Sequence, residues 1–334
     1  MPSVPGSGGT AGNAQGRIGT FGIGRTTFGI ALLVLFARAH GAAAPLPASD
    51  LMHLTGSDRL LVVSPHPDDE SLCCAGVIQR AVAAGARVGI VWLTSGDAFE
   101  LDADLVEHKV HAGTEGLREL GMRRMQEARE AARVLHVPID AQYFLGFPDR
   151  GLLPLMLDHF YVPYVSPHTG LAAVGYPGTF RPGASYEGRN LQRELEAVLD
   201  QLQPTYVLAP SPLDAHPDHR AAGDLAIRAL GERHQLDRMR YWIVHGGTAW
   251  PFPRGLHPER SLSPPRRTGD MQWEAVTLDV DQRNVKLAAL RCYDTQMFGL
   301  ERRFLTSFVR SEEIYARRPL PSILATPESS ESEP

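Results

Sequence analysis

Two short clusters of histidine and carboxylate residues, far apart in the chain, carry the strongest chemical signal. Residues 66–70 read His-Pro-Asp-Asp-Glu, and residues 216–219 read His-Pro-Asp-His. Each cluster follows an apolar run typical of a buried strand and precedes a segment typical of a helix. In a parallel sheet both would emerge at the carboxyl edge, where open α/β folds keep their active sites. The sequence therefore predicts that the two clusters converge.

Two histidines and one carboxylate, drawn from the two clusters, have the composition of an open catalytic zinc site. Water bound at such a site is acidified to near neutral pH and becomes a nucleophile. The same donor types also suit non-haem Fe(II), so zinc, iron or another divalent ion stays open. Taken alone, each cluster could be an ordinary helix start, where acidic residues and proline are common. Two clusters at equivalent strand ends favour the metal interpretation.

The elements that must position these clusters alternate along the chain. Apolar runs predict strands at residues 59–64, 87–93, 142–145, 205–209, 241–245 and 274–278. Helical patterns lie between them, at residues 71–84, 116–136, 191–202, 221–230 and 280–293. This alternation predicts an α/β fold, a Rossmann-like, mainly parallel sheet with helices on both faces. The sequence has neither a glycine-rich dinucleotide fingerprint nor a phosphate loop, so nucleotide cofactors are not indicated.

The composition limits the classes of binding partner that we expect. The formal net charge is −5, so nucleic acid and anionic membrane are not expected partners. The three cysteines, Cys73, Cys74 and Cys292, do not form a disulfide framework. We expect the adjacent pair to be small buried apolar side chains without thiol chemistry. The oligomeric state is not fixed by the sequence.

The N-terminus is predicted to be an export signal. An apolar run at residues 28–37 follows a Gly-, Ser- and Thr-rich stretch with Arg17 and Arg25, and small residues come after it. This pattern fits a signal peptide, with an uncleaved anchor as the alternative. We therefore divide the chain into residues 1–43, a catalytic domain at 44–326 and a disordered acidic tail at 327–334. The protein is expected to be periplasmic or secreted.

Several stretches, in chain order, resemble the LmbE/PIG-L family of zinc-dependent N-acetylglucosaminyl deacetylases. They are residues 64–70, 93–98, 124–128, 145–149, 216–220 and 286–296. One departure follows the first cluster, where a small Gly-Gly pair gives way to Cys74-Ala75-Gly76. The long irregular segment at 149–186 is the other departure, and a loop of this length is usually a lid or a binding wall.

The resemblance implies a role for each residue of the clusters. His66, Asp69 and His219 would bind zinc, and Asp68 would be the general base toward the attacking water. His216 would stabilise the oxyanion or act as general acid. Asp218 would orient His216 and favour its protonated form.

Three further residues in these stretches have expected roles. Asp97 and Arg124 are candidates for contacts to sugar hydroxyls, with an Arg124–Glu127 ion pair as the alternative. Glu70 is expected to have a structural role at the helix start.

The predicted activity is hydrolysis of an N-acyl, chiefly N-acetyl, group on an amino sugar or its conjugate by zinc-activated water. The partner would be a small-molecule or glycan N-acyl amino sugar, and no membrane contact is expected beyond the possible N-terminal anchor. Three alternatives remain: an amidase acting on a non-sugar amide, an Fe(II) oxygenase, and a non-catalytic carbohydrate-binding protein. The oxygenase is disfavoured by the alternating strand–helix pattern, and the binding protein by Asp68 and His216, which a metal does not need.

Overall fold

The computed structural model describes residues 45–98, 113–248, 250–266, 268 and 271–317. The chain divides into two units, Met1–Ala44 and Pro45–Pro334, and every described residue belongs to the second. The predicted signal at 28–37 and the predicted tail at 327–334 lie outside the described residues. Within the described ranges, no helix combines the length and apolar character needed to cross a membrane.

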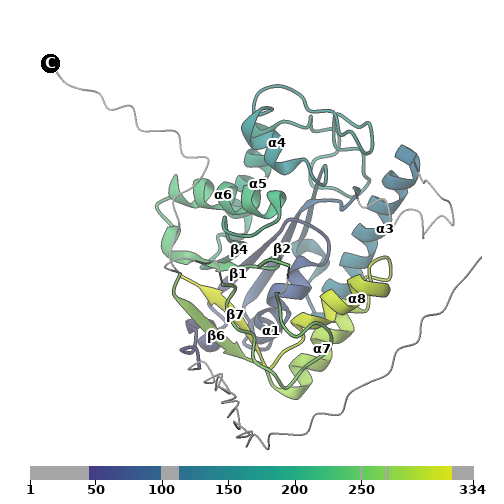
Figure 1. Ribbon diagram of the computed structural model, residues 1–334. Helices are drawn as coiled ribbons and strands as arrows, with labels where there is room; N and C mark the ends of the chain where they lie inside the picture. Colours follow the sequence, from purple (N-terminus) through teal and green to yellow (C-terminus); the bar gives the residue numbers. More distant parts are fainter. Residues whose placement is uncertain (1–44, 99–112, 249, 267, 269–270, 318–334) are drawn as a thin grey trace, which may run out of the picture. The chain divides into compact units, whose positions relative to one another are not determined.

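A seven-stranded sheet with the order β3-β2-β1-β4-β5-β7-β6 forms the centre of this domain (Figure 1). Strands β1 to β5 are parallel, and β7 is antiparallel to both of its neighbours. The strands are β1 (Arg59–Ser64), β2 (Arg87–Thr94), β3 (Gln142–Phe147), β4 (Tyr206–Pro210), β5 (Met239–Trp242), β6 (Trp273–Thr277) and β7 (Glu312–Ala316).

Helices cover the sheet in two groups. The helices are α1 (Asp69–Ala83), α3 (Gly113–Val134), α4 (Leu152–Leu157), α5 (Gly188–Leu202), α6 (Pro217–Gly231), α7 (Val280–Leu290) and α8 (Gly299–Leu305). Helix α1 packs on β1 and β2 and contacts α7, which contacts α3. Helix α5 packs on β1 to β3 and on α6, with α4 beside both (Figure 1). The predicted Rossmann-like class, with helices on both faces, is confirmed.

The strand order places the two clusters side by side. From β1 the chain adds β2 and β3 on one side, then crosses back to add β4 and β5 on the other. Strands β1 and β4 are therefore neighbours at the point where the order reverses, which is where open α/β sheets bind ligands. Residues 66–70 follow β1 and residues 216–219 follow β4.

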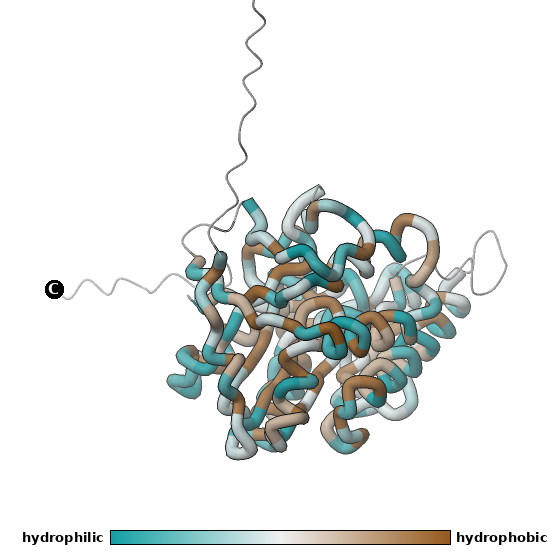
Figure 2. Tube along the Cα trace, turned by 90° about the horizontal axis from the view of Figure 1, so that it is seen from below, coloured by the Kyte–Doolittle hydropathy of each residue, from teal (hydrophilic) through white to brown (hydrophobic). Residues whose placement is uncertain are grey.

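Burial on both faces explains why the central strands are apolar throughout. In β1 every residue after Arg59 is buried, and in β2 every residue after Arg87 is buried. Strands covered on both faces do not alternate between apolar and polar residues. Hydrophobic residues accordingly concentrate in the inner segments of the chain trace (Figure 2).

The helix starts and the cysteines differ from the sequence expectation. Helices α1 and α6 begin at Asp69 and Pro217, earlier than the predicted starts at residues 71 and 221, so both clusters extend into first helical turns. Strand β7 and helices α4 and α8 have no counterpart among the predicted elements.

The expectation of two unlinked cysteines is wrong: Cys73 and Cys74 are buried but joined by a disulfide.

Candidate active site

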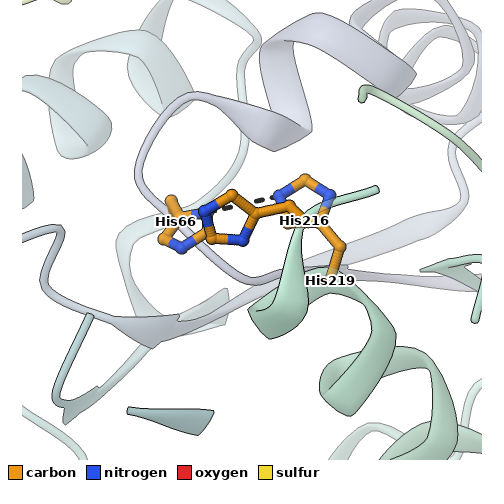
Figure 3. Close-up of side chains that lie close together, drawn as sticks. All are labelled: His66, His216 and His219. Carbon is orange, nitrogen blue, oxygen red and sulfur yellow. Dashed lines mark hydrogen bonds between the residues drawn. The ribbon is translucent and has the colours of Figure 1, made fainter. Parts of the chain in front are cut away.

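The two clusters meet at the carboxyl ends of β1 and β4. His66 lies in the turn after β1, His216 is the N-cap of α6, and His219 is in the first turn of that helix. Figure 3 shows the three imidazoles gathered in one place. The Nε2 atom of His219 lies 3.3 Å from Nδ1 of His66. The predicted convergence of the clusters is therefore present in the structure.

The three predicted metal ligands form a compact triangle of donor atoms. Asp69 Oδ2 lies 3.3 Å from His66 Nδ1 and 3.2 Å from His219 Nε2. With the 3.3 Å between the two nitrogens, all three edges are nearly equal. Tetrahedral zinc with ligand bonds of about 2.0–2.1 Å separates its donor atoms by roughly 3.3 Å. These residues therefore fit a divalent metal ion.

Other donor groups lie close by. His66, His216 and His219 form one set, and His66, Asp149 and Asp218 form another, each with donor atoms within 4.8 Å of one another. The second set uses the Nε2 atom of His66, at 3.2 Å from Asp149 and 3.3 Å from Asp218. Of these sets, the triangle with Asp69 has the edge lengths that fit a single ion.

Carboxylates also lie beside the other ring nitrogen of each histidine in the triangle. Asp214 Oδ2 lies 3.2 Å from His219 Nδ1, while Asp149 and Asp218 flank His66 Nε2. Carboxylate–histidine pairs of this kind fix the ring orientation and make the metal-binding nitrogen more basic.

Backbone amides hold the Asp214 carboxylate in place. Its Oδ2 accepts hydrogen bonds from the amides of Val244, at 2.9 Å, and His245, at 3.0 Å, and its Oδ1 accepts one from His216 N at 2.8 Å. Although burial opposes the charge, His219, His245 and these amides keep the pKa of Asp214 well below its usual range. The site thus contains a buried anion fixed to two loops.

The carboxylates make the site strongly negative. Burial lowers the pKa of His219, but Asp69 and Asp214 outweigh it and raise that pKa to about 9. Burial also lowers the pKa of His66. The carboxylates of Asp149, Asp218 and Asp69 outweigh this effect and raise that pKa well above its ordinary value. A site that attracts protons this strongly also favours a cation held by the same atoms.

Asp68 lines the cavity beside the metal ligands. Its backbone has φ = 131°, a conformation that is costly for a non-glycine residue and concentrates at functional sites. Gln296 Nε2 donates to its Oδ2 at 2.7 Å, and Arg124 Nη2 lies 3.7 Å from the same atom. Burial and the charge of Asp69 raise the pKa of Asp68 well above its ordinary value. This position suits the predicted general base.

Glu70 has the structural surroundings that the sequence predicts. It is fully buried, and its carboxylate accepts hydrogen bonds from Asp68 N at 3.2 Å and from Trp92 Nε1 at 2.9 Å. The Tyr293 hydroxyl also donates to it. Glu70 therefore supports the turn that carries Asp68.

The environment of His216 differs from the expectation. Asp218 does not orient it: the Asp218 carboxylate accepts from the amides of Arg150, at 2.6 Å, and Leu152, at 3.1 Å, and contacts His66. The Asp218 backbone amide instead donates to His216 Nδ1 at 3.2 Å. Burial, together with the imidazoles of His66, His219 and His245, lowers the pKa of His216 to about 2. The lowered pKa favours a neutral imidazole, and the protonated form of His216 stays a prediction.

The two predicted sugar-binding residues are buried. Asp97 is fully buried; it accepts a hydrogen bond from Asp149 N at 3.0 Å and another from the Tyr176 hydroxyl. Burial raises the pKa of Asp97 to about 6. Arg124 lines the cavity, but two of its nitrogens donate to the carbonyls of Gly96, at 2.9 Å, and Pro67, at 3.1 Å. Both residues therefore support the site loops, with Asp97 set behind Asp149.

The cavity in front of these residues has a volume of about 230 Å³. From the long segment at 149–186 only its first two residues, Asp149 and Arg150, line it. The rest of that segment packs elsewhere; Phe180 N, for example, donates to Phe144 O in the edge strand β3 at 2.7 Å. The predicted lid or wall is thus limited to the start of this segment, and α8 supplies the opposite wall through Glu301, Phe304 and Leu305.

Four site residues had no assigned role in the sequence: Asp149, Asp214, His245 and Gln296. Asp149 and His245 come just after strands, a position that could have marked them. Asp214 precedes His216 by two residues, which is a local signal for support of the second cluster. Gln296 follows α7, and the sequence alone does not indicate that it reaches Asp68.

A doubly wound α/β sheet with two histidines and one carboxylate gathered at its carboxyl edge, and a further carboxylate beside them, has the composition expected of a metal-dependent hydrolase. The sequence matches the family described as PIG-L, GlcNAc-PI de-N-acetylase, over residues 61–230. This match spans half of the chain, and the protein belongs to the PIG-L family of deacetylases. The predicted family and the predicted deacetylase class are confirmed.

Two curated relatives and one solved structure illustrate the likeness. A 1D-myo-inositol 2-acetamido-2-deoxy-alpha-D-glucopyranoside deacetylase of Saccharomonospora viridis is 32% identical, over 71% of this chain and 85% of that protein. A diacetylchitobiose deacetylase of Thermococcus kodakarensis is 27% identical, over 52% of this chain and 49% of that protein.

The solved structure is the A40926 pseudoaglycone deacetylase Dbv21. It has a TM-score of 0.50 and 18% identity, with 78% of this chain and 96% of that chain covered. At this identity the likeness supports the fold alone.

Proposed function

We propose that the protein removes the N-acetyl group from an amino sugar or its conjugate, by metal-dependent hydrolysis. The observation that carries this proposal is the triangle of His66, Asp69 and His219 with Asp68 beside it in one cavity. A divalent ion in that triangle, for which we propose zinc, would polarise the amide carbonyl and acidify a water molecule. The two curated relatives are named for deacetylation of acetamido sugars.

Asp68 is assigned as the general base. Its carboxylate would accept a proton from the water whose oxygen attacks the amide carbon. When the C–N bond breaks, the same proton can pass to the departing nitrogen, so that acetate and a free amine leave. The hydrogen bond from Gln296, at 2.7 Å, favours the ionised carboxylate, while burial opposes it.

His216 is assigned as the oxyanion stabiliser. Because its Nδ1 accepts a hydrogen bond from Asp218 N, a neutral His216 carries its proton on Nε2. That N–H group can donate to the oxygen of the amide as negative charge develops on it. The neutral ring makes the alternative role, general acid, the weaker of the two.

Acetate and amine release tests the proposal directly. The purified full chain is incubated with zinc and N-acetylglucosamine conjugates, and in parallel with non-sugar acetamides, while oxygen uptake is recorded. We expect equal amounts of acetate and free amine from the sugar conjugates and no oxygen uptake. Release from non-sugar amides alone would favour the amidase, oxygen uptake would favour the oxygenase, and binding without release would favour a carbohydrate-binding protein.

We also propose that the protein is exported. The support is the apolar run at residues 28–37 behind two arginines. N-terminal sequencing of protein recovered from outside the cytoplasm is expected to begin after this run. A sequence that begins before residue 28 would show that the signal is not cleaved.

A further inference from the structure

A second cleft adjoins the active-site cavity. Its volume is about 480 Å³, and it is lined by His245, Arg254, Leu300, Glu301, Arg303 and Phe304. Three of these residues, His245, Glu301 and Phe304, also line the active-site cavity. A substrate whose amide lies at the metal ligands can therefore extend over this shared wall into the second cleft.

Arg254 is held at this cleft by an aromatic ring. Its guanidinium carbon lies 4.4 Å above the centre of the Phe304 ring, within the range of a cation–π contact. Its Nη2 donates to Thr248 O at 3.4 Å, whereas its buried Nη1 has no hydrogen-bond partner among the described residues. A half-buried guanidinium with one nitrogen that lacks a hydrogen-bond partner favours an anionic acceptor nearby.

The charges around the cleft also favour an anion. Arg254 and Arg303 line it together with one carboxylate, that of Glu301. Arg303 is exposed on α8, so a ligand can reach it without a change in the fold. Leu300, which is 82% exposed, adds apolar surface beside the two arginines.

We propose that the second cleft binds an anionic group, a carboxylate or a phosphate, carried by the part of the substrate beyond the N-acetyl amino sugar. This inference rests on the proposed function, because it places the sugar at the metal ligands. Arg254 would bind the anion from its fixed position on Phe304, and Arg303 would close on it from the rim. The apolar surface of Leu300 and Phe304 would contact the linker between sugar and anion.

Equilibrium binding tests this inference separately from turnover. The full chain with Asp68→Asn is loaded with zinc and titrated calorimetrically with N-acetylglucosaminides bearing hydroxyethyl, carboxyethyl or phosphoethyl groups. We expect an anionic ligand to bind about tenfold more tightly than the hydroxyethyl one at low salt, with less preference at high salt. The carboxyethyl and phosphoethyl arms identify which anion is preferred.

Charge-neutralising variants assign the preference to the cleft. Arg303→Gln is expected to reduce it roughly threefold to fivefold, as for an exposed charge pair, and Arg254→Gln by about tenfold. The matched control is Arg302→Gln, an exposed neighbour on α8 that does not line either cavity, which should leave the preference unchanged.

Each result decides between the two proposals. Equal affinity for all three ligands, or a preference that survives both variants, would overturn the anion site while leaving the proposed function intact. If Arg302→Gln reduces the preference for anionic ligands equally, that preference comes from the general positive charge of the surface. This result would also overturn the anion site. Failure of even the hydroxyethyl ligand to bind would refute the assignment of the active-site cavity to the sugar, and the anion site with it.

Discussion

Replacement of Asp214 by Asn should weaken metal binding although Asp214 is not a ligand. The Asp214 carboxylate lies 3.2 Å from Nδ1 of His219, and its charge makes the opposite nitrogen of that ring a better donor. Loss of such a partner lowers metal affinity by about 10- to 100-fold, which corresponds to about 1.4–2.7 kcal/mol of binding free energy.

The variant should also be less stable without metal. Asp214 accepts three backbone amide bonds, from His216, Val244 and His245, and an Asn side chain has a single acceptor oxygen. At least one buried amide then loses its acceptor, at a cost of about 1–3 kcal/mol in the free energy of unfolding.

Competition with a chromophoric zinc chelator gives the dissociation constant, and thermal unfolding of the metal-free protein reports stability. The control is Asp200→Asn, whose carboxylate is 64% exposed and pairs with Arg233 at the surface; it should keep wild-type affinity. A dissociation constant for Asp214→Asn within about twofold of wild type, in a protein that is still folded, would refute the support role.

Three further predictions concern other parts of the site. Gln296→Leu removes the donor to Asp68, so the acidic limb of the kcat/KM profile should move to higher pH. Burial raises the pKa of Asp97 to about 6, so the folded state holds this proton more tightly than the unfolded chain. Stability should therefore fall as pH rises from about 4 to 6, and this fall should be smaller in Asp97→Asn. Tyr293→Phe removes the hydroxyl that donates to buried Glu70 and should cost about 1–3 kcal/mol of unfolding free energy.

Each of these predictions has an outcome that would contradict it. A pH profile of Gln296→Leu that overlays the wild-type profile would contradict the role given to the amide. Denaturant titrations at several pH values measure the Asp97 effect, and equal slopes in both proteins would rule it out. Tyr161, which is 71% exposed, provides the control Tyr161→Phe; the prediction fails if both tyrosine variants are equally stable.

The sequence predicts the strands and the sheet of this protein well because the residue patterns that specify them are local. Apolar runs buried on both faces identify β1 and β4 directly, and strand ends in a parallel sheet share one edge. The two clusters could therefore be paired, and the donor atoms of His66, Asp69 and His219 do converge.

The rest of the site depends on contacts between distant segments. Gln296 is 228 residues from Asp68 along the chain, yet donates to it, and no local pattern encodes such a pair. For the same reason, the sequence does not reveal the partners of Asp218. Its carboxylate accepts hydrogen bonds from backbone amides of the segment after β3, and not from His216. Asp97 resembles a binding residue in the sequence, but tertiary packing buries it behind Asp149.

The most direct test is a paired measurement of zinc content and acetate release on Asp68→Asn. The substitution keeps the side-chain shape and leaves the three ligand residues unchanged, so we expect wild-type zinc content. Acetate release from an N-acetylglucosamine conjugate should fall by about 10²- to 10⁴-fold, the usual contribution of a general base. A variant that binds zinc and releases acetate at the wild-type rate would contradict the account.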